Sequence, residues 1–208
     1  MIIADLQYFP PVTFFNALYT RTHVYFDLYE HYRKMSFRNR CMIAGAHGII
    51  SLSVPLQRGR NQRSPMHEVL ISEDTNWRAS HFKSIQSSYN RSPFFEHYQD
   101  ELAVIYSKPF NRLWEWNLHC LNWVKGKLEW HTEIRLTEAA IPFQANGIDD
   151  LRNSVLPKNY GNWNALRYRQ VFEERTGFFP NLSILDLLFN KGKEAAECFR
   201  TIPEIDIT

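Results

Sequence analysis

The spacing of apolar residues changes near residue 74, and this change limits the folds that the chain can adopt. Over residues 24–29, apolar side chains alternate with polar or aromatic ones, which is the period of a half-buried strand. After Asp74, large side chains recur at every fourth position and share one helix face: Trp77, His81, Ile85 and Tyr89. Strands followed by several helices predict an α/β or α+β fold, with a central mixed sheet from the N-terminal third, up to about position 72.

Prolines and glycines divide the chain into further elements. We expect strands within residues 2–8, 67–72 and 131–137, a hairpin turn at 45–48, and helices from residue 12, after Pro93, after Pro109, and around 168–176 and 182–190. The 208 residues are expected to form a single domain. Within it, residues 138–165 would be an irregular lid or linker, and residues 166–208 a helical C-terminal part.

Composition argues against several classes of function. The formal net charge is +2, from 24 basic and 22 acidic residues, so we expect no nucleic-acid partner, and any basic patch must be local. The three cysteines are far apart and form no CxxC pair, which favours a reducing, cytoplasmic location. No run of about 18 apolar residues predicts a transmembrane segment, and the N-terminal stretch lacks the pattern of a signal peptide. Phosphate-loop, dinucleotide, nucleophile-elbow and zincin motifs are also absent.

The segment SFRNR, residues 36–40, is the first candidate for ligand binding. Arg38 and Arg40 are two positions apart, so an extended segment would project both from one face, with Asn39 on the other. Guanidinium groups bind carboxylates and phosphates through paired hydrogen bonds. Two interpretations stay open, which are solvated charges at a strand edge and contacts to an anionic ligand.

His81 is the candidate for proton transfer, because an imidazole titrates near neutral pH and this one shares a helix face with Trp77 and Tyr89. The alternative is a core histidine that is hydrogen-bonded to a backbone carbonyl. Tyr8 precedes two prolines at the end of a strand, so its ring is expected either in a cleft or over the core.

Cysteine and metal chemistry receive weaker support. Cys41, beside Arg40, is either a nucleophile with a lowered pKa or a buried strand cysteine, and the second is the more common case. His23, Asp27 and His31 could be metal ligands, but their alternation is more typical of an exposed polar strand face. We therefore predict no metal site, and the sequence names no cofactor.

Five segments follow one another in an order that is typical of a known family: QYFPPVTFFNAL, VYFDLYEHYRKMSFRNRCMI, GIISLSVPL, NWRASHFKSIQSSYNRSPFFEHY and GFFPNLSILDLLFN. From residue 2 to about residue 192, the chain resembles the WbqC-like protein family, most closely its Bacteroidetes branch. The resemblance implies a role in bacterial surface-polysaccharide and O-antigen biosynthesis. It also implies activity as an amino-acid (glycine) or acyl transferase that acts on a sugar.

The resemblance gives the candidate residues provisional roles. Arg38 or Arg40 would hold a carboxylate or phosphate of the donor, and Asn39 would orient an amide or a sugar hydroxyl. His81 would take the proton of the acceptor. Three aromatic rings would stack on the sugar or the donor: Tyr8, Trp77 and Tyr89. The expected partner is a nucleotide-activated sugar or a small anionic donor.

The chain departs from the family at its start. Many members carry His-Gln-Pro there, where this sequence has Ala4, Asp5 and Leu6. If that histidine is the catalytic base in other members, this chain lacks it. A non-catalytic protein that binds a glycan or a partner in the same pathway is therefore the alternative function.

Overall fold

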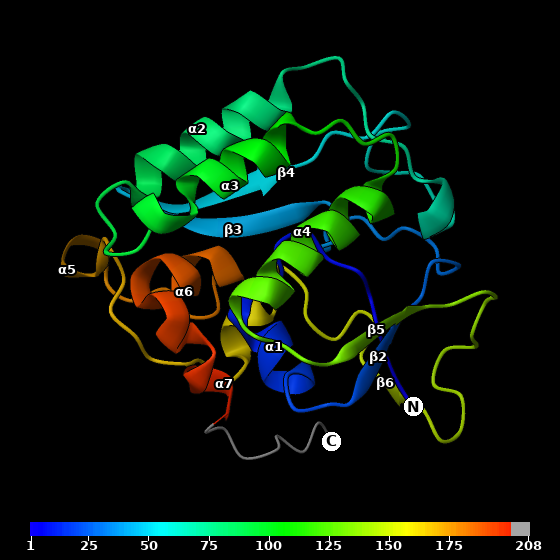
Figure 1. Cartoon of the computed structure of the whole chain (residues 1–208). Coiled ribbons are helices and arrows are strands. Elements are labelled where there is room, and N and C mark those ends of the chain that lie inside the picture. Colours follow the sequence, from blue (N-terminus) through cyan, green and yellow to red (C-terminus); the bar gives the residue numbers. More distant parts are fainter. Residues whose placement is uncertain (201–208) are drawn as a thin grey trace.

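The computed structural model describes residues 1–200 and confirms the mixed α/β class (Figure 1). The strands are Ile2–Ala4 (β1), His23–Phe26 (β2), Arg40–Gly45 (β3), Gly48–Ser53 (β4), Glu133–Leu136 (β5) and Asp149–Asp150 (β6). The α-helices are Val12–Leu18 (α1), Trp77–Tyr89 (α2), Glu96–Ser107 (α3), Leu113–Lys127 (α4), Glu173–Thr176 (α5), Ile184–Lys191 (α6) and Glu197–Arg200 (α7). Single turns of 3-10 helix occur at Met66–Glu68 (η1), Tyr160–Asn162 (η2) and Gly192–Ala195 (η3).

The main sheet has the strand order β5-β2-β1-β6, and every neighbouring pair in it is parallel. Ile3 of β1 pairs with Tyr25 on one side and with Asp150 on the other. Only β1 and β2 come from the N-terminal third of the chain, because β5 begins at Glu133 and β6 at Asp149. Parallel neighbours need long crossover connections, and residues 27–132 form the one that joins β2 to β5.

The predicted hairpin is confirmed as a separate two-stranded sheet of β3 and β4. Gly45 pairs with Gly48 across its turn, where Gly48 has a φ of +134° that disfavours other residues. In Figure 1 the hairpin lies between the pair α2 and α3 above it and α6 below it. Both α2 and α6 contact β3.

The predicted face of α2 is confirmed as part of the core, since all four residues on it are buried: Trp77, His81, Ile85 and Tyr89. The core cluster extends from Ile2 in β1 to Phe199 in α7. Residues from both ends of the described chain thus pack in one core. The single domain over residues 1–208 stays a prediction.

One predicted element is wrong, and a second is confirmed only in part. The strand predicted at residues 67–72 is absent, because residues 67–68 belong to η1 and the remaining residues form only isolated bridges. The backbone hydrogen bonds of this stretch go to three different segments, at Leu28, Pro55 and Asn111. Of the helix predicted around 168–176, only Glu173–Thr176 is helical, as α5, whereas residues 171–172 form a turn and residues 168–170 have no regular structure. The Gln170 side chain bonds instead to the backbone N–H and carbonyl of Phe179. Residues 201–208 of the expected helical C-terminal part lie outside the described residues.

Candidate functional site

The four parallel strands end at one edge of the sheet, and a polar residue follows each of them. Asp5 follows β1, Asp27 follows β2, Thr137 follows β5, and Arg152 lies two positions after β6. All four side chains are buried. Ligands of open parallel sheets bind outside the carboxyl ends of the strands, so this edge is the candidate site.

Arg38 links two carboxylates at this edge. Its fully buried guanidinium donates from Nη2 to Oε2 of Glu30 at 2.6 Å and from Nε to Oε1 at 3.0 Å. Its Nη1 lies 3.5 Å from Oδ2 of Asp5 and makes no hydrogen bond. Asp5 is held in turn by Nε2 of Gln7 at 3.0 Å and the backbone N–H of Asn153 at 2.8 Å. Arg38 and Glu30 thus form a bidentate ion pair, and Nη1 of Arg38 has no hydrogen-bond partner.

Glu30 is the group of this edge that titrates near neutral pH. Burial raises the pKa of its carboxyl group from 4.5 to about 7, and the opposing effect of Arg38 is not large enough to restore it. The charges of Asp5 and Asp27 raise that pKa further. The side chain is 9% exposed, so the carboxylate sits at the boundary between the core and solvent. A carboxylate with such a pKa can both accept and release a proton at neutral pH.

A second guanidinium completes the edge. Arg152 pairs through Nη1 with Asp27 and through Nη2 with Asp150, both at 2.5 Å, and it also donates to the carbonyls of residues 141–142. Oδ1 of Asp27 accepts the backbone N–H of Glu30 at 3.2 Å, so the two ion-pair groups are connected. Arg152 thus ties β2, β6 and the irregular segment after β5 together. The proposed lid or linker role of residues 138–165 stays a prediction.

The expected extended geometry of residues 38–40 is wrong. Arg38 and Asn39 lie in the turn and bend that precede β3, and only Arg40 belongs to the strand. Arg38 therefore points into the core, whereas Arg40 is half-buried. Asn39 is buried and accepts a hydrogen bond from the hydroxyl of Tyr32 at 2.9 Å. The ligand-binding roles of these three residues stay predictions.

Three predicted residues, Tyr8, Trp77 and His81, come together in a buried aromatic cluster. The Tyr8 hydroxyl lies 3.0 Å from Nδ1 of His81 and 2.5 Å from the Tyr106 hydroxyl, and the Trp77 ring meets His81 edge to face at 5.2 Å. Burial lowers the pKa of His81 from 6.5 to about 4, although a hydrogen bond to the backbone of Ser53 opposes this. The imidazole is therefore neutral at pH 7 and a weak base. Its catalytic role stays a prediction.

Tyr89 and Cys41 are both buried inside the fold. The buried Tyr89 hydroxyl donates to Oδ1 of Asp186 at 2.8 Å and accepts from the Ala44 N–H at 2.9 Å. Cys41 is fully buried, and burial raises the pKa of its thiol, so a nucleophile with a lowered pKa is excluded there. The interpretation as a buried strand cysteine holds.

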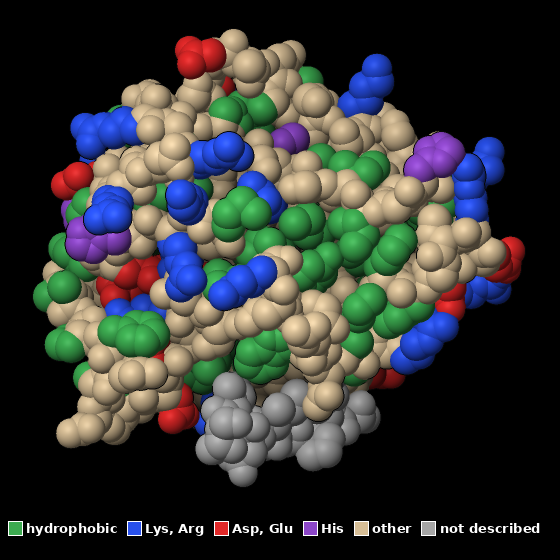
Figure 2. Space-filling view, turned by 180° about the vertical axis from the view of Figure 1, so that it is seen from behind, with side chains coloured by type: hydrophobic (Ala, Val, Ile, Leu, Met, Phe, Trp, Pro, Cys, Tyr) green, Lys and Arg blue, Asp and Glu red, His purple; other side chains and the backbone are tan. Residues whose placement is uncertain are grey.

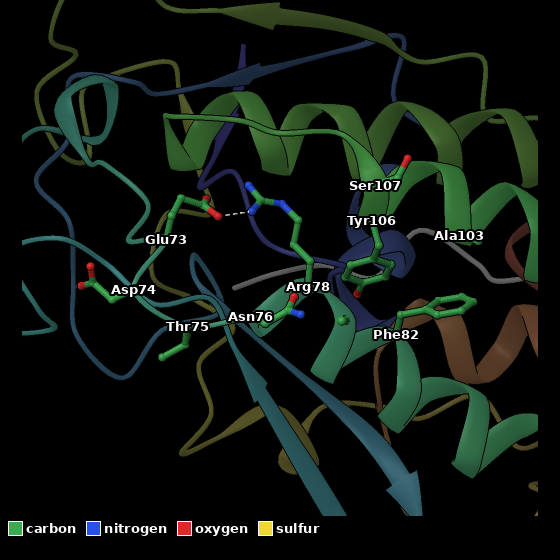
Figure 3. A pocket seen from close by; sticks show the side chains of 10 residues that line it. Glu73, Asp74, Thr75, Asn76, Arg78, Phe82, Ala103, Tyr106 and Ser107 are labelled. Atoms are coloured by element: carbon green, nitrogen blue, oxygen red, sulfur yellow. Dashed lines mark hydrogen bonds and ion pairs between the residues drawn. The ribbon is translucent and has the colours of Figure 1, made fainter.

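A hollow of about 580 Å³ lies between the start of α2 and the end of α3, and none of the polar residues of the carboxyl edge lines it (Figure 3). Arg78 reaches across it to pair with Glu73, while the rings of Phe82 and Tyr106 form an apolar wall. Tyr106 separates the hollow from the Tyr8 hydroxyl. Arg78 pairs with Glu73 and Asp74 accepts a hydrogen bond from the Ser72 hydroxyl, so both acidic groups of the hollow have partners, and we place the candidate site at the carboxyl edge of the sheet instead.

Comparison with protein families gives a match to the WbqC-like protein family over residues 7–156. The chain belongs to this family. The matched range includes Glu30, Arg38 and Arg152 of the carboxyl edge, and it excludes Ala4 and Asp5. The family match confirms the resemblance seen in the sequence, whereas the Bacteroidetes branch is not supported by these comparisons.

One relative within the curated proteins is the uncharacterized protein Rv1507c of Mycobacterium tuberculosis. It is 28% identical over 199 residues, which cover 81% of this chain and 84% of the relative. No solved structure matches the chain. Within residues 1–200, no helix has the length and apolar character needed to cross a bilayer. In the same part of the chain, no three His, Cys, Asp or Glu side chains are arranged to hold a metal ion.

The sequence prediction does not include five residues of the site: Asp5, Asp27, Glu30, Thr137 and Arg152. For Asp27 the sequence pattern indicates only a metal ligand or a polar strand face. A usable signal existed, because Asp5 and Asp27 each come directly after a short apolar strand, where parallel strands would bring them to one edge. Arg152 gave no such signal, since β6 has only two residues and both are aspartates.

Proposed function

We propose that this protein is a transferase of bacterial surface-polysaccharide or O-antigen biosynthesis. It would move an amino-acid (glycine) or acyl group from a small, anionic, activated acyl donor onto a sugar, and the sugar acceptor would be a nucleotide-activated sugar. Its expected location is the cytoplasm. Family membership supports the pathway, and the single observation that supports chemistry is the buried Glu30 with a pKa of about 7 beside Arg38.

In this proposal Glu30 is the general base. The acceptor nitrogen or oxygen attacks the carbonyl carbon of the donor, Glu30 takes the proton that the acceptor loses, and the bond from that carbon to the leaving group breaks. Arg38 is a positioning residue, because its bidentate bond fixes the Glu30 carboxylate. Glu30 is preferred over His81 as the base, since the His81 imidazole is already bound to Tyr8 and has a pKa of about 4.

A non-catalytic protein that binds a glycan or partner in the same pathway is the second candidate. The observation that favours it is Ala4, which stands in β1 where many members of the family have histidine. Ala4 lies directly before Asp5, so a histidine there would have adjoined the carboxyl edge of the sheet. A base at Glu30 would have to replace the function of such a histidine.

The two candidates separate in a combined binding and product assay on the full chain. UDP-N-acetylglucosamine, glycine and acetyl-coenzyme A would be tested singly by thermal shift. Product formation would be followed by mass spectrometry in the mixture of UDP-N-acetylglucosamine as acceptor and acetyl-coenzyme A as donor, from which coenzyme A leaves as the thiol. Glu30→Gln keeps the shape of the side chain and is expected to retain the thermal shift while product formation falls by a factor of about 10² or more. His81→Gln is the matched control and is expected to change the rate by less than about tenfold.

Each result has a definite meaning. Binding without any product would favour the non-catalytic candidate. A Glu30→Gln variant that forms product at the wild-type rate would refute Glu30 as the base, and loss of product only in His81→Gln would return that role to the histidine. No thermal shift and no product with any of the three probes would count against both candidates.

A further inference from the structure

The chain has one long stretch without acidic residues. From residue 31 to residue 67 there is no Asp or Glu, whereas seven Lys or Arg residues occur: Arg33, Lys34, Arg38, Arg40, Arg58, Arg60 and Arg63. The formal net charge of the whole chain is only +2. Positive charge is therefore concentrated locally, in two segments at residues 31–40 and 57–64.

The fold brings these two segments side by side. The N–H of Tyr32 donates to the carbonyl of Ser64 at 2.8 Å, and His31 forms a bridge with Pro65. Nη1 of Arg58 reaches the Ser64 hydroxyl at 3.3 Å. We call the exposed surface of residues 31–40 and 57–64 the basic rim.

The charges of the basic rim face outward. Arg38 is the exception, since it is buried against Glu30. The other six side chains are exposed or half-buried: Arg33, Lys34, Arg40, Arg58, Arg60 and Arg63. Within residues 1–200 none of these six pairs with a carboxylate. Figure 2 shows Lys and Arg side chains most closely gathered over the left half of one face of the molecule, with a small group of acidic side chains beside them and further basic side chains along the right edge.

Apolar side chains accompany these charges. Met35 is 54% exposed, and the sulfur atom lies 3.9 Å from Nη1 of Arg40. Tyr29 is 37% exposed and stands against the ring of His67, at the base of the second segment. Anionic lipid surfaces attract clusters of Lys and Arg, and exposed apolar or aromatic tips enter the interface between headgroups and acyl chains.

We propose that the basic rim docks the protein on the surface of a membrane that contains anionic lipids. Net positive charge alone would suit nucleic acid equally well. The exposed Met35 thioether favours lipid, because nucleic-acid surfaces take up aromatic stacking and guanidinium contacts more readily than an aliphatic thioether. Docking in this way needs no membrane-spanning segment.

The docking face adjoins the candidate site. Glu30 directly precedes the first segment of the basic rim, and its carbonyl accepts the N–H of Met66, two residues after the second segment, at 2.9 Å. A docked molecule would therefore present the Glu30 carboxylate toward substrates that are attached to lipid. The docking itself does not depend on whether Glu30 carries out chemistry.

Vesicle sedimentation at near-physiological salt tests the proposal on the full chain. Phosphatidylcholine vesicles that also contain phosphatidylglycerol, an anionic lipid, are expected to bind the protein, whereas pure phosphatidylcholine vesicles are not. The variant Arg58→Gln/Arg60→Gln/Arg63→Gln should bind about 100-fold more weakly, because each basic residue near an anionic surface contributes about fivefold. The matched control Lys83→Gln/Arg91→Gln/Lys193→Gln removes three exposed charges elsewhere and should stay within about threefold of wild type.

Further outcomes decide against the proposal or strengthen it. Equal loss of binding in both triple variants, or equal binding to both kinds of vesicle, would overturn it. Tight binding of a short single-stranded RNA with no binding to vesicles would assign the basic rim to nucleic acid instead. Met35→Ser is expected to weaken vesicle binding while leaving retention on a heparin column unchanged, which would separate lipid insertion from general attraction to polyanions.

Discussion

Arg38 lies between two carboxylates, 2.6 Å from Glu30 and 3.5 Å from Asp5, and none of the three side chains is more than 9% exposed. The contact to Glu30 is bidentate, and the contact to Asp5 is an ion pair without a hydrogen bond. Arg38 and Arg40 therefore have different environments, since one is buried in this ion pair and the other is half-buried. Their spacing of two positions had predicted that both would project from the same face.

Replacing Arg38 should therefore be far more damaging than replacing Arg40. Arg38→Ala leaves two buried carboxylates unpaired, and loss of one partner from a buried ion pair costs about 3–5 kcal/mol. The melting temperature should fall by roughly 10 °C in circular dichroism. Arg40→Ala is the control and should cost less than about 1 kcal/mol, because that side chain is half-buried and pairs with no carboxylate within residues 1–200. Similar losses in both variants would refute this account of Arg38.

The Glu30 carboxyl group should make stability depend on pH. Its folded-state pKa, about 7, lies above the unfolded value of 4.5, so the folded state binds the proton more tightly. The stabilising contribution is present below about pH 4.5 and is lost as the pH rises through 7, by up to about 3 kcal/mol. Urea unfolding at pH 5 and pH 8 should show that Glu30→Gln gains stability relative to wild type at the higher pH. A difference between the two proteins that does not change with pH would contradict the raised pKa.

His81 should act in the opposite direction. Burial lowers the pKa from 6.5 to about 4, so the unfolded chain binds the proton more tightly. The contribution to stability is present above pH 6.5 and is lost as the pH falls toward 4, again by up to about 3 kcal/mol. NMR of the imidazole should show a neutral ring down to about pH 5, and His81→Gln should weaken the acid sensitivity of unfolding. An imidazole that titrates near pH 6.5 would argue for a far more open site.

Tyr89→Phe tests whether that ring is part of the structure or of a binding site. The change removes a donor to Asp186 and leaves the buried N–H of Ala44 without an acceptor. We expect a loss of about 1–3 kcal/mol in urea unfolding and no change in any ligand affinity. Tyr25→Phe is the control, because its hydroxyl bonds to the exposed Arg135 and should contribute less than about 1 kcal/mol. Loss of ligand affinity at unchanged stability would restore Tyr89 to the site.

Two glycines should respond to alanine in opposite directions. A Cβ atom at Gly192 would lie 2.6 Å from the ring of Phe94, and φ there is +57°, so Gly192→Ala should destabilise by about 1–3 kcal/mol. Gly126 lies within α4 with nothing within 4 Å of an added Cβ, so Gly126→Ala should stabilise by about 0.5–1 kcal/mol. Thermal melting of the two single variants measures both effects, and a shared sign would show that the surroundings of one glycine are misassigned.

The sequence alone determined those helices and turns whose conformation depends on residues close together in the chain. The four-residue spacing from Trp77 to Tyr89 gave the buried face of α2, and the two glycines gave the turn between β3 and β4. Apolar spacing also identified the α6 helix, where Ser183 accepts a bond from the Leu185 N–H as its cap. The family resemblance could be read from the same local segments.

Only the tertiary structure decided which strands join and which charges become buried. β2 pairs with β5, although α2, α3 and α4 lie between them in the chain, and β6 is recognisable as a strand only through its pairing with β1. Glu30 and Arg38 look like surface charges in the sequence. Their roles arise because the parallel strands end at one edge of the sheet, where both side chains become buried. Burial raises the pKa of Glu30, and the Arg38 guanidinium lies between Glu30 and Asp5, which are far apart in the sequence.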